Sequence, residues 1–524
     1  MDFYASVDNK ITASDYSLGR INIGLSVNSW TLITLHGTFP TDIPPGAYYV
    51  GWIIDPENLN SDETNELNNT AVSPSQLTVT ADSGRTLYVD LSAHGTGDGS
   101  SWSNAFPTLQ DALAAAESGC QIRVAGGVYT PDRGIGTAPG DRRATFSLNP
   151  GVTVAGGYAG AAGPDPDVRD TKNHPTILSG DLNGDDAAVE DPCELGSDPS
   201  RKDNSLHVAT LLDADGTTVL DGVRITGGYA DETAEFRYGA GLYISAGAPR
   251  VQGCEFTGNW AALGGGAICT SAGNAEIIDS TLCGNASGLG PEKDLGDGSA
   301  VYVRGGGATL INCSVHGNFA WGRGGAVTVV PGGVFAAINC CFHANQAATQ
   351  GGTIYSIGGL VTLVNCTVLD YSPHASVNAV LCETWVPDDR AELRVANCIL
   401  WGHERQIAGV RDSFVAVAFS DIQGGWPGTG NLDADPLFVD PAGPDGRIGT
   451  KDDDLRLRRG SPCLDAGSVD ALPEDVLDLD GDGDVQERLP IDLAGAARVA
   501  GDGVDLGAYE AGTSATESPS DRRG

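Results

Sequence analysis

Apolar and polar positions repeat along the middle of the chain with a period of about 26 residues. In a first series, an apolar residue follows a small or glycine-rich turn, at successive spacings of 26, 33, 26, 27 and 26 residues. In a second series, a cysteine or serine precedes a short apolar stretch, at spacings of 26, 33, 27, 26 and 32. The two series are Leu242, Ile268, Val301, Val327, Ile354 and Val380, and Cys254, Ser280, Cys313, Cys340, Cys366 and Cys398. Both lengthen in the interval that holds an inserted segment at 288–294, and this shared register predicts a solenoid of stacked repeats.

Each repeat contains short strands separated by turns. In residues 297–320, one strand, a glycine turn, a second strand and an asparagine turn follow in order. Glycine suits corners that need a positive φ. The asparagines recur as Asn259, Asn285, Asn318 and Asn345, and we expect their side chains to hydrogen-bond between neighbouring rungs. Regular rungs are predicted for residues 204–434.

Other patterns flank the repeats. Residues 1–82 alternate apolar and polar positions in short runs, which favours an antiparallel β-sandwich. Residues 84–203 are predicted to hold the first rungs and a helix, whose apolar face closes the open end of the core: Leu109, Ala112, Leu113 and Ala116. The period is lost after Gly425. Residues 435–511 are predicted as a carboxy-terminal domain, followed by a polar, disordered tail at 512–524.

Motifs in the amino-terminal part are similar to two known groups. The stretch 46–71 resembles the later strands of CARDB, a cell-adhesion-related sandwich, and implies a partial domain with a truncated start. The matching residues are Gly46, Tyr48, Tyr49, Asp55, Glu63, Asn65, Glu66, Asn68 and Asn69. The segment GDGSSWSNAF (97–106) and residues 146–186 resemble the start of right-handed parallel β-helices of the pectin-lyase-like superfamily. The fold class expected is therefore all-β: a right-handed parallel β-helix preceded by a partial β-sandwich.

Later motifs are similar to surface proteins. The turns GGAI (265–268) and GGAV (324–327), with F-x-x-N turns at 256–259 and 342–345, resemble repeats of the polymorphic outer membrane proteins, a β-helical adhesin family. The carboxy-terminal part resembles the choice-of-anchor Q domain of secreted bacterial proteins through Ser461, Pro462, Asp465, Gly467, Asp505, Gly507, Ala508, Tyr509 and Glu510. These resemblances imply an extracellular or bacterial cell-surface protein that acts in adhesion.

Composition narrows the classes of partner. With 69 acidic and 30 basic residues among 524, the formal net charge is −39, which argues against nucleic acid and anionic membranes. No apolar stretch approaches the ~18 residues of a membrane span. The first 20 residues lack a signal peptide, although a truncated start would remove one. The 12 cysteines form no C-x-x-C pair, and we expect a buried stack of thiols, with disulfides between rungs as the alternative.

One acidic loop is the best candidate for a metal site. Asp478, Asp480, Asp482, Asp484 and Glu487 place carboxylates at short intervals between glycines, as in tight loops that bind Ca²⁺. An EF-hand would need an acid where Leu489 stands, so a dockerin-like half-site with structural Ca²⁺ is predicted. The alternative is a solvated acidic turn. Weaker candidates are residues 445–454 and 181–186.

Strand alternation assigns two outward rows. If the first series points inward, the adjoining residues point outward: Tyr243, Cys269, Tyr302, Thr328, Tyr355 and Leu381. Tyr243, Tyr302 and Tyr355 would recur about every 9.6 Å and stack on sugar rings; alternatively they reflect the high β-propensity of tyrosine. A further row, Thr257, Cys283, His316, His343, Leu369 and Trp401, is expected at the surface, with metal chelation as the alternative.

Two functions remain open. The first is a non-enzymatic protein that binds a polysaccharide or cell-surface glycan, or acts in adhesion. The second is a Ca²⁺-dependent polysaccharide lyase or a glycoside hydrolase of the same fold. The outward rows hold only Arg304 and Glu383 as charged residues, and inverting glycosidases need paired carboxylates. The sequence therefore identifies no catalytic residue and favours binding. Acids in the predicted loops, which form no pattern, are Asp231, Glu232, Glu235, Asp388 and Asp389.

Overall fold

The computed structural model describes most of the chain in two compact units, residues 1–85 and 86–524. The described residues are 2–12, 15–20, 46–53, 70–79, 84–290, 296–370, 378–385, 389–501 and 503–511. No helix among them is long and apolar enough to cross a membrane.

The first unit contains a four-stranded antiparallel sheet in the order β2-β1-β3-β4. Its strands are β1 (Asp2–Ser6), β2 (Tyr16–Arg20), β3 (Gly46–Ile53) and β4 (Thr70–Val79). Antiparallel strands agree with the alternating pattern. The acidic and asparagine positions of the CARDB motif, 55–69, lie outside the described residues, so that resemblance stays a prediction.

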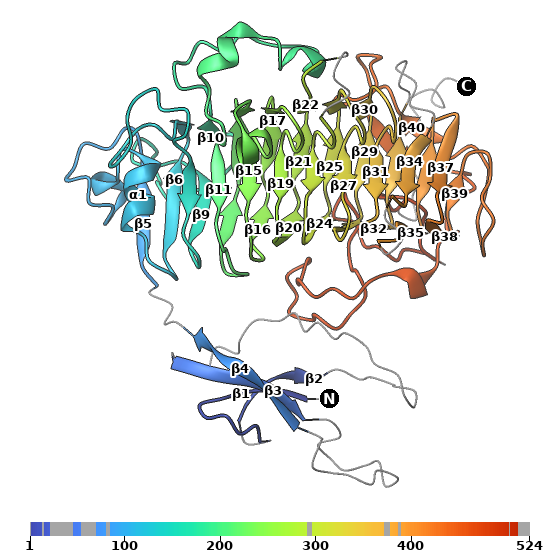
Figure 1. Cartoon of the computed structure of the whole chain (residues 1–524), viewed down its shortest axis with the longest axis horizontal. Coiled ribbons are helices and arrows are strands. Elements are labelled where there is room, and N and C mark those ends of the chain that lie inside the picture. Colours follow the sequence, from blue (N-terminus) through green and yellow to red (C-terminus); the bar gives the residue numbers. More distant parts are fainter. Residues whose placement is uncertain are drawn as a thin grey trace. The chain divides into compact units, whose positions relative to one another are not determined.

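The second unit is built on three long parallel sheets (Figure 1). The eleven-stranded sheet contains β5 (Thr86–Val89), β6 (Gln121–Ala125), β9 (Thr153–Tyr158), β12 (Val219–Asp221), β16 (Arg250–Gln252), β20 (Asn274–Ile278), β24 (Gly307–Ile311), β28 (Val334–Ile338), β32 (Leu360–Val364), β35 (Glu392–Ala396) and β38 (Phe414–Ala418). The ten-stranded sheet contains β7 (Gly127–Tyr129), β10 (Thr176–Ser179), β13 (Val223–Thr226), β17 (Glu255–Thr257), β21 (Thr281–Cys283), β25 (Ser314–His316), β29 (Cys341–His343), β33 (Thr367–Leu369), β36 (Ile399–Trp401) and β39 (Asp421–Ile422).

The nine-stranded sheet contains β8 (Phe146–Leu148), β11 (Ala209–Leu211), β15 (Leu242–Ile244), β19 (Ile268–Thr270), β23 (Val301–Val303), β27 (Val327–Val329), β31 (Ile354–Ile357), β34 (Asn378–Glu383) and β37 (Arg405–Val410). A five-stranded parallel ladder contains β14 (Tyr229–Ala230), β18 (Trp260–Ala261), β22 (Ala286–Ser287), β26 (Phe319–Ala320) and β30 (Gln346–Ala347). Each turn of the chain adds one strand to each long sheet. The chain is a parallel β-helix, as predicted.

The register of the nine-stranded sheet matches the first repeat series. Leu242 pairs with Ile268, and the pairing continues in order to Val380. All six residues are fully buried in the main core. The cysteines of the second series are buried in the same core, and none of the twelve cysteines of the chain forms a disulfide. The stack of thiols is confirmed, and the disulfide alternative is wrong.

A short helix closes the amino-terminal end of this core. In α1 (Leu109–Ala115), Leu109, Ala112 and Leu113 are buried against β5, β6 and β8. Thr108 caps the helix by accepting a hydrogen bond from the backbone N–H of Asp111. A helix thus lies where the sequence predicts one, packed on the first strands of the core. The other short helices within the described part of the chain are 3₁₀ turns: η2 (Trp102–Asn104), η3 (Pro192–Glu194), η4 (Pro199–Asp203), η5 (Ala234–Arg237) and η6 (Val469–Ala471).

The asparagine column runs through the buried corner that follows the ten-stranded sheet. The side-chain N–H group of Asn285 donates to Asn318 Oδ1 at 3.0 Å, and that of Asn318 donates to Asn345 Oδ1 at 2.9 Å. The column starts at Asn259 and ends at Asp370, whose Oδ1 accepts the backbone N–H of Asn345. A second corner uses left-handed Asp279, Asn312, Asn339, Asn365 and Asn397, at φ values of 48–55°. Asn and Asp tolerate this conformation better than other L-residues do.

The carboxy-terminal segment packs on the outward face of the ten-stranded sheet. Its strands β40 (Phe438–Asp440) and β41 (Asp454–Leu457) pair antiparallel. Phe438, Leu455 and Leu506 share a hydrophobic cluster with Leu369 and Ile399 of the sheet. The segment therefore belongs to the same compact unit as the β-helix, because it covers apolar positions of the last rungs.

Several residues that carry the resemblance to the choice-of-anchor Q domain form hydrogen bonds within this segment. Asp505 Oδ1 accepts the backbone N–H of Asp465 at 2.7 Å, and Glu510 Oε2 accepts that of Asp505 at 3.1 Å. Arg498, fully buried, lies 3.3 Å from Glu510. A Cβ at Gly507 (φ 89°) would lie 2.5 Å from Oγ1 of Thr367 in β33. These residues have a structural role at the interface with the sheet.

The row that contains His316 and His343 is buried beneath this segment, so its assignment to the surface is wrong. Each histidine is 6% exposed, and their rings stack at 4.7 Å between centroids. His316 Nδ1 lies 3.0 Å from the carbonyl oxygen of Gly449, and His343 Nε2 lies 3.5 Å from Asp453 Oδ2. Burial lowers the pKa of His316, and burial with the neighbouring imidazole lowers that of His343 to about 3.

Acidification should therefore destabilise the β-helix. Below pH 6.5, the ordinary pKa of histidine, the unfolded chain binds protons that the folded chain excludes. From pH 6.5 to about 5.5, the free energy of unfolding should fall by up to about 1.4 kcal/mol per pH unit for each histidine. His343→Leu, which copies Leu369 one rung on, should reduce this slope in urea titrations. The control His94→Gln, at an exposed residue, should keep it; equal slopes in all three proteins would contradict the assignment.

Removing one amide from the asparagine column should also be costly. Asn318→Ala deletes a side chain that makes five hydrogen bonds, with Asn345 Oδ1, the carbonyl oxygens of Leu282 and His316, and the backbone and side-chain N–H groups of Asn285. We expect the free energy of unfolding to fall by about 3 kcal/mol or more. Asn274→Ala, at an exposed strand position, should change it by less than about 0.5 kcal/mol.

Candidate functional site

The carboxylates of the acidic loop converge in two overlapping groups. The ligand oxygens of Asp478, Asp480 and Asp482 lie within 4.8 Å of one another, and so do those of Asp475, Asp480 and Glu487. Four of the five predicted ligands are thus brought together. Asp484 belongs to neither group, and its Oδ1 instead accepts the backbone N–H of Gln486.

Asp475 was missed because it lies three residues before the acidic motif. The chain folds back on itself here: the backbone N–H of Asp475 donates to the carbonyl oxygen of Glu487 at 2.9 Å. Asp475 is 1% exposed, and its Oδ2 accepts the backbone N–H of Leu479 at 2.8 Å. Tertiary pairing of two loop segments therefore completes the group.

The carboxylates of this loop form no ion pair with the residues that the structure describes. Burial and the carboxylates of Asp480 and Asp482 raise the pKa of Glu487. Its Oε1 is buried without a hydrogen-bond partner. An orphaned carboxylate oxygen among other carboxylates fits a hard cation, which takes oxygen ligands and removes the repulsion between them.

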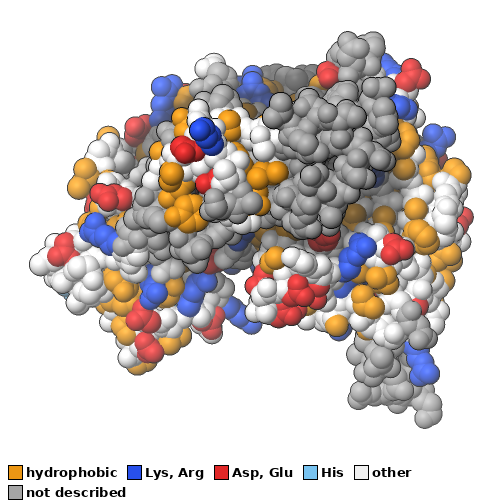
Figure 2. All heavy atoms as spheres, turned by 90° about the horizontal axis from the view of Figure 1, so that it is seen from below, with side chains coloured by type: hydrophobic (Ala, Val, Ile, Leu, Met, Phe, Trp, Pro, Cys, Tyr) orange, Lys and Arg blue, Asp and Glu red, His pale blue; other side chains and the backbone are white. Residues whose placement is uncertain are grey.

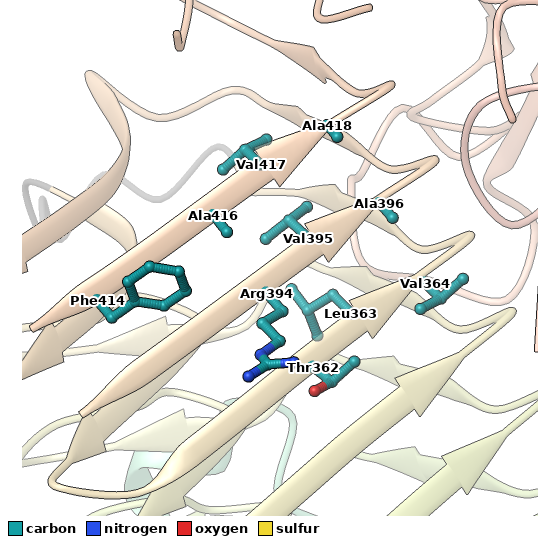
Figure 3. Close-up of a pocket in the computed structure, with 10 residues that line it drawn as sticks. All are labelled: Thr362, Leu363, Val364, Arg394, Val395, Ala396, Phe414, Ala416, Val417 and Ala418. Atoms are coloured by element: carbon teal, nitrogen blue, oxygen red, sulfur yellow. The ribbon is translucent and has the colours of Figure 1, made fainter. Parts of the chain in front are cut away.

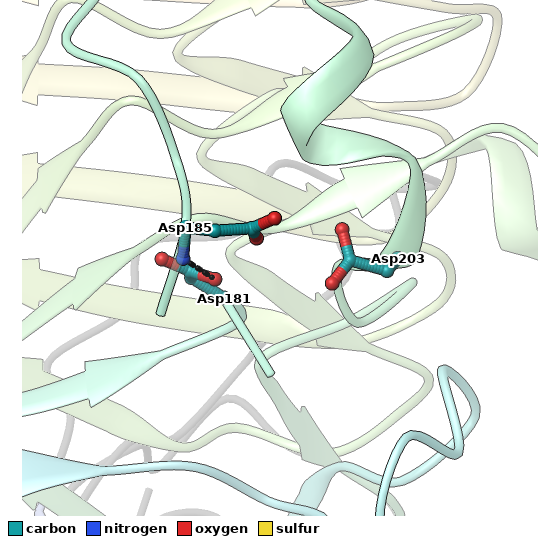
Figure 4. Close-up of side chains that lie close together, drawn as sticks. All are labelled: Asp181, Asp185 and Asp203. Atoms are coloured by element: carbon teal, nitrogen blue, oxygen red, sulfur yellow. Dashed lines mark hydrogen bonds between the residues drawn. The ribbon is translucent and has the colours of Figure 1, made fainter. Parts of the chain in front are cut away.

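A second acidic group lies in the connection between β10 and β11, where Asp181, Asp185 and Asp203 converge (Figure 4). Asp181 Oδ1 accepts the backbone N–H of Asp185 at 3.2 Å. The Asn183 side chain donates to Asp203, which ends η4. Asp203 lies outside the segment 181–186 that the sequence indicated, because η4 brings it back to the loop.

The third candidate, 445–454, forms no such group among the residues that the structure describes. Several of its carboxylates accept hydrogen bonds from backbone N–H groups of the same loop. Asp453 Oδ2 accepts the N–H of Gly449 at 2.6 Å, and Asp452 Oδ2 accepts that of Asp445 at 3.1 Å. Asp454 pairs with Arg456. This loop is a hydrogen-bonded turn that covers the histidine row.

The tyrosine row points away from the main core, but it is not an open platform. Tyr243 stacks with His207 at 5.1 Å, and Tyr302 lies 5.3 Å from Tyr238. Tyr355 is 1% exposed, so the expectation that it stacks on a sugar is wrong. The turns that precede the strands fold over the row: Tyr238, Gly264, Asp297, Arg323 and Gln350 occupy this position in successive rungs.

An exposed tryptophan lies next to the buried Tyr355. Trp385 is 49% exposed, and the guanidinium carbons of Arg323 and Arg411 lie 5.5 and 5.6 Å from its ring. Glu383 accepts a hydrogen bond from Tyr355 Oη at 3.0 Å and pairs with Arg411 at 3.2 Å. The sequence contained a signal for Trp385, because the outward alternation of Leu381 and Glu383 continues to it.

Glutamates on the other sheet faces are paired with arginines. Glu255 lies 2.8 Å from Arg224, Glu276 lies 3.3 Å from Arg250, and Glu392 lies 3.2 Å from Arg394. Burial raises the pKa of Glu255, but the hydrogen bonds and charges of Arg224 and Lys451 outweigh it and lower the pKa. A carboxylate held ionised in this way is poorly suited to act as a general acid.

An open depression of about 410 Å³ lies on the outward face of β32, β35 and β38 (Figure 3). Its lining is mostly apolar, with Arg394 and Phe414 as the largest side chains; Phe414 is 38% exposed. The lining residues are Thr362, Leu363, Val364, Arg394, Val395, Ala396, Phe414, Ala416, Val417 and Ala418. On the face seen in Figure 2, the described hydrophobic side chains form small groups among charged and polar ones.

Comparisons with known proteins return solved structures at low similarity. No family model matches the chain, and no curated protein matches it. A pectate lyase, Pel9A, is similar with a TM-score of 0.40 and 15% identity, over 81% of this chain and 96% of that one. An alginate lyase from Paenibacillus sp. str. FPU-7 (TM-score 0.35, 14%, covering 67% and 99%) and a rhamnogalacturonan lyase (0.35, 12%, covering 72% and 97%) are also similar. Because these TM-scores and identities are low, the assignment of the fold is based on the parallel sheets of this structure.

Proposed function

We propose that this protein is an extracellular β-helix that binds an extended glycan without cleaving it, on the outward face of the nine-stranded sheet. The observation that carries the proposal is the exposed ring of Trp385, beside Arg323 and Arg411. An exposed aromatic ring packs against the apolar face of a sugar, and guanidinium groups donate hydrogen bonds to its oxygens. Tyr243 and Tyr302, both partly exposed, extend aromatic contacts along the same sheet.

The ion pairs on the sheet faces support binding over hydrolysis. An inverting glycosidase needs two carboxyl groups about 6.5–9.5 Å apart, one of them protonated. Glu255, Glu276 and Glu392 each pair with an arginine instead. Glu383 is held by Tyr355 and Arg411. These pairings engage the glutamates of the sheet faces in ion pairs and hydrogen bonds.

The two acidic sites are proposed as structural Ca²⁺ sites. Asp475, Asp478, Asp480, Asp482 and Glu487 would hold an ion in the carboxy-terminal loop. Asp181, Asp185 and Asp203 would hold one in the connection between β10 and β11. Ca²⁺ takes six to eight oxygen ligands, and extracellular modules bind it at up to about 1 mM. Bound there, the ion would neutralise clustered charge and join loop segments that are distant in sequence.

The motifs at the two ends of the chain fit an extracellular protein. The amino-terminal sheet would be a partial CARDB-like domain, and the carboxy-terminal segment a choice-of-anchor Q-like domain. Both resemblances imply secreted or cell-surface proteins, and together with the adhesin-type turns they support a role in adhesion.

A Ca²⁺-dependent polysaccharide lyase is the second candidate. It is favoured by the acidic group at Asp181, Asp185 and Asp203, because Arg201 and Lys202 adjoin Asp203 in the chain. A cation next to a basic side chain could activate and deprotonate an acidic sugar. However, Lys202 Nζ already donates to Tyr229 Oη and lies 4.3 Å from the centre of that ring, and Arg201 pairs with Asp186.

Calcium should raise the thermal stability of the protein through Asp480. Because Asp480 belongs to both acidic groups of its loop, Asp480→Asn should weaken Ca²⁺ binding by at least about tenfold and reduce the rise in Tm. Asp484→Asn removes the same charge outside both groups and should bind Ca²⁺ like wild type. Isothermal titration of Ca²⁺ into the EDTA-treated proteins measures the affinity of each variant, and thermal unfolding with and without Ca²⁺ measures the rise in Tm. Equal losses in the two variants would show that only total charge matters.

Replacement of Trp385 should weaken glycan binding. Trp385→Ala removes the exposed ring, and we expect about a tenfold loss of affinity for the best ligand from a glycan array. Phe414→Ala removes a ring of similar exposure from the depression on the eleven-stranded sheet and should leave affinity unchanged. The reverse result would move the site to the depression. Wild-type protein incubated with the same glycan, with and without Ca²⁺, should release no unsaturated sugar and no new reducing ends. Either product would establish the enzymatic alternative.

A further inference from the structure

Two arginines next to strands of the nine-stranded sheet, Arg304 and Arg323, differ from those on the other sheet faces. Arg224, Arg250 and Arg394 each form an ion pair with a glutamate. The guanidinium groups of Arg304 and Arg323 make no hydrogen bond or ion pair with the residues that the structure describes. In a chain with 69 acidic and 30 basic residues, an arginine without a carboxylate partner is unexpected.

Both arginines lie over aromatic rings instead. The guanidinium carbon of Arg304 is 4.9 Å from the ring centre of Tyr238, which packs on Tyr302. That of Arg323 is 5.2 Å from the ring centre of Tyr355 and 5.5 Å from that of Trp385. A cation over a ring face is attracted to it, and this attraction holds the planar guanidinium group in place while its N–H donors stay available.

The two arginine–aromatic clusters lie on the same side of the β-helix. Tyr238 and Arg323 occupy the same turn position three rungs apart, with Gly264 and Asp297 between them. Three rungs correspond to about 14 Å. Arg304 is exposed and Arg323 partly exposed, so a chain molecule lying along the sheet could reach both.

The free donors favour a ligand with acid groups. A guanidinium fork matches a carboxylate or sulfate group, and such hydrogen bonds are stronger than those to neutral oxygens. The net charge of −39 opposes a polyanion at long range, but charges beyond about 8 Å are largely screened at physiological salt. Asp297 lies nearby, and its Oδ1 is engaged by the backbone N–H of Arg323 at 2.7 Å.

We propose that Arg304 and Arg323 bind the acid groups of an anionic glycan, spaced along a chain that lies across the rungs of the nine-stranded sheet. This inference rests on the proposed glycan-binding function and adds the chemical class of the ligand. The aromatic rings position the two guanidinium groups, and the exposed face of Trp385 contacts the sugar.

The test uses the full chain and three oligosaccharides of equal length: a polygalacturonate, a chondroitin sulfate and a neutral β-glucan. Wild type should bind an acidic oligosaccharide at least about tenfold more tightly than the neutral one in isothermal titration. The carboxylate and sulfate probes distinguish the two kinds of acid group. Arg304→Gln and Arg323→Gln should each remove most of this preference for the acidic oligosaccharide. Arg304→Lys and Arg323→Lys, which keep the positive charge, should show part of the preference that the glutamine variants lose. Arg394→Gln, which removes a paired arginine on another sheet, should leave it intact.

Two results would overturn the proposal in different ways. Equal affinity for acidic and neutral oligosaccharides, unchanged in the Arg304→Gln/Arg323→Gln double variant, would refute the anionic ligand but leave glycan binding in place. Binding of none of the three probes, nor of any glycan on an array, would refute the proposed function as well. Unchanged thermal unfolding of the glutamine variants, together with the lysine rescue, separates loss of contact from loss of fold.

Discussion

A column of buried asparagine amides ties the rungs of this β-helix to one another. The side-chain amides of Asn259, Asn285 and Asn318 each donate to the side-chain oxygen of the next asparagine and to backbone carbonyl oxygens. At the end of the column, Asp370 accepts a hydrogen bond from the backbone N–H of Asn345. Buried polar groups must be satisfied, so one register of stacking fulfils every bond and a slipped register breaks several of them. The apolar series that begins at Leu242 and the thiol series that begins at Cys254 fill the core only in that same register.

The fixed register has consequences on each outward face. On the ten-stranded sheet it lines up His316, His343 and Leu369, which are apolar or easily neutralised, and the carboxy-terminal segment covers them. On the eleven-stranded sheet it places Arg250 beside Glu276 of the neighbouring strand, and Arg394 pairs with Glu392 of its own strand. On the nine-stranded sheet it aligns rings, and turn residues fold over them to produce arginine–aromatic clusters. The three faces therefore differ chemically, although they are built from the same repeat.

The charged groups of the β-helix also differ between its loops and its sheet faces. The acidic groups that converge lie in the loop 475–487 and in the connection between β10 and β11, away from the sheet faces. There, clustered carboxylates without basic partners suit an external cation. The exposed ring of Trp385 and the guanidinium groups of Arg304 and Arg323, which form no ion pair with a described residue, lie next to strands of the nine-stranded sheet. Metal binding and ligand binding are thus proposed at separate places, the first to hold loops and the second to contact a glycan.

The sequence by itself determined the solenoid, the inward series, the thiol stack, the helical cap and most of the acidic loop. These follow from local spacing: a 26-residue period fixes which residues stack, and strand alternation fixes which face each side chain takes. Only the tertiary structure decided what covers each outward face. The turns that bury Tyr355, the segment that buries His343, and the chain reversals that bring Asp475 and Asp203 to their acidic groups depend on packing between residues distant in sequence. Such contacts have no period, so no pattern in one sequence records them.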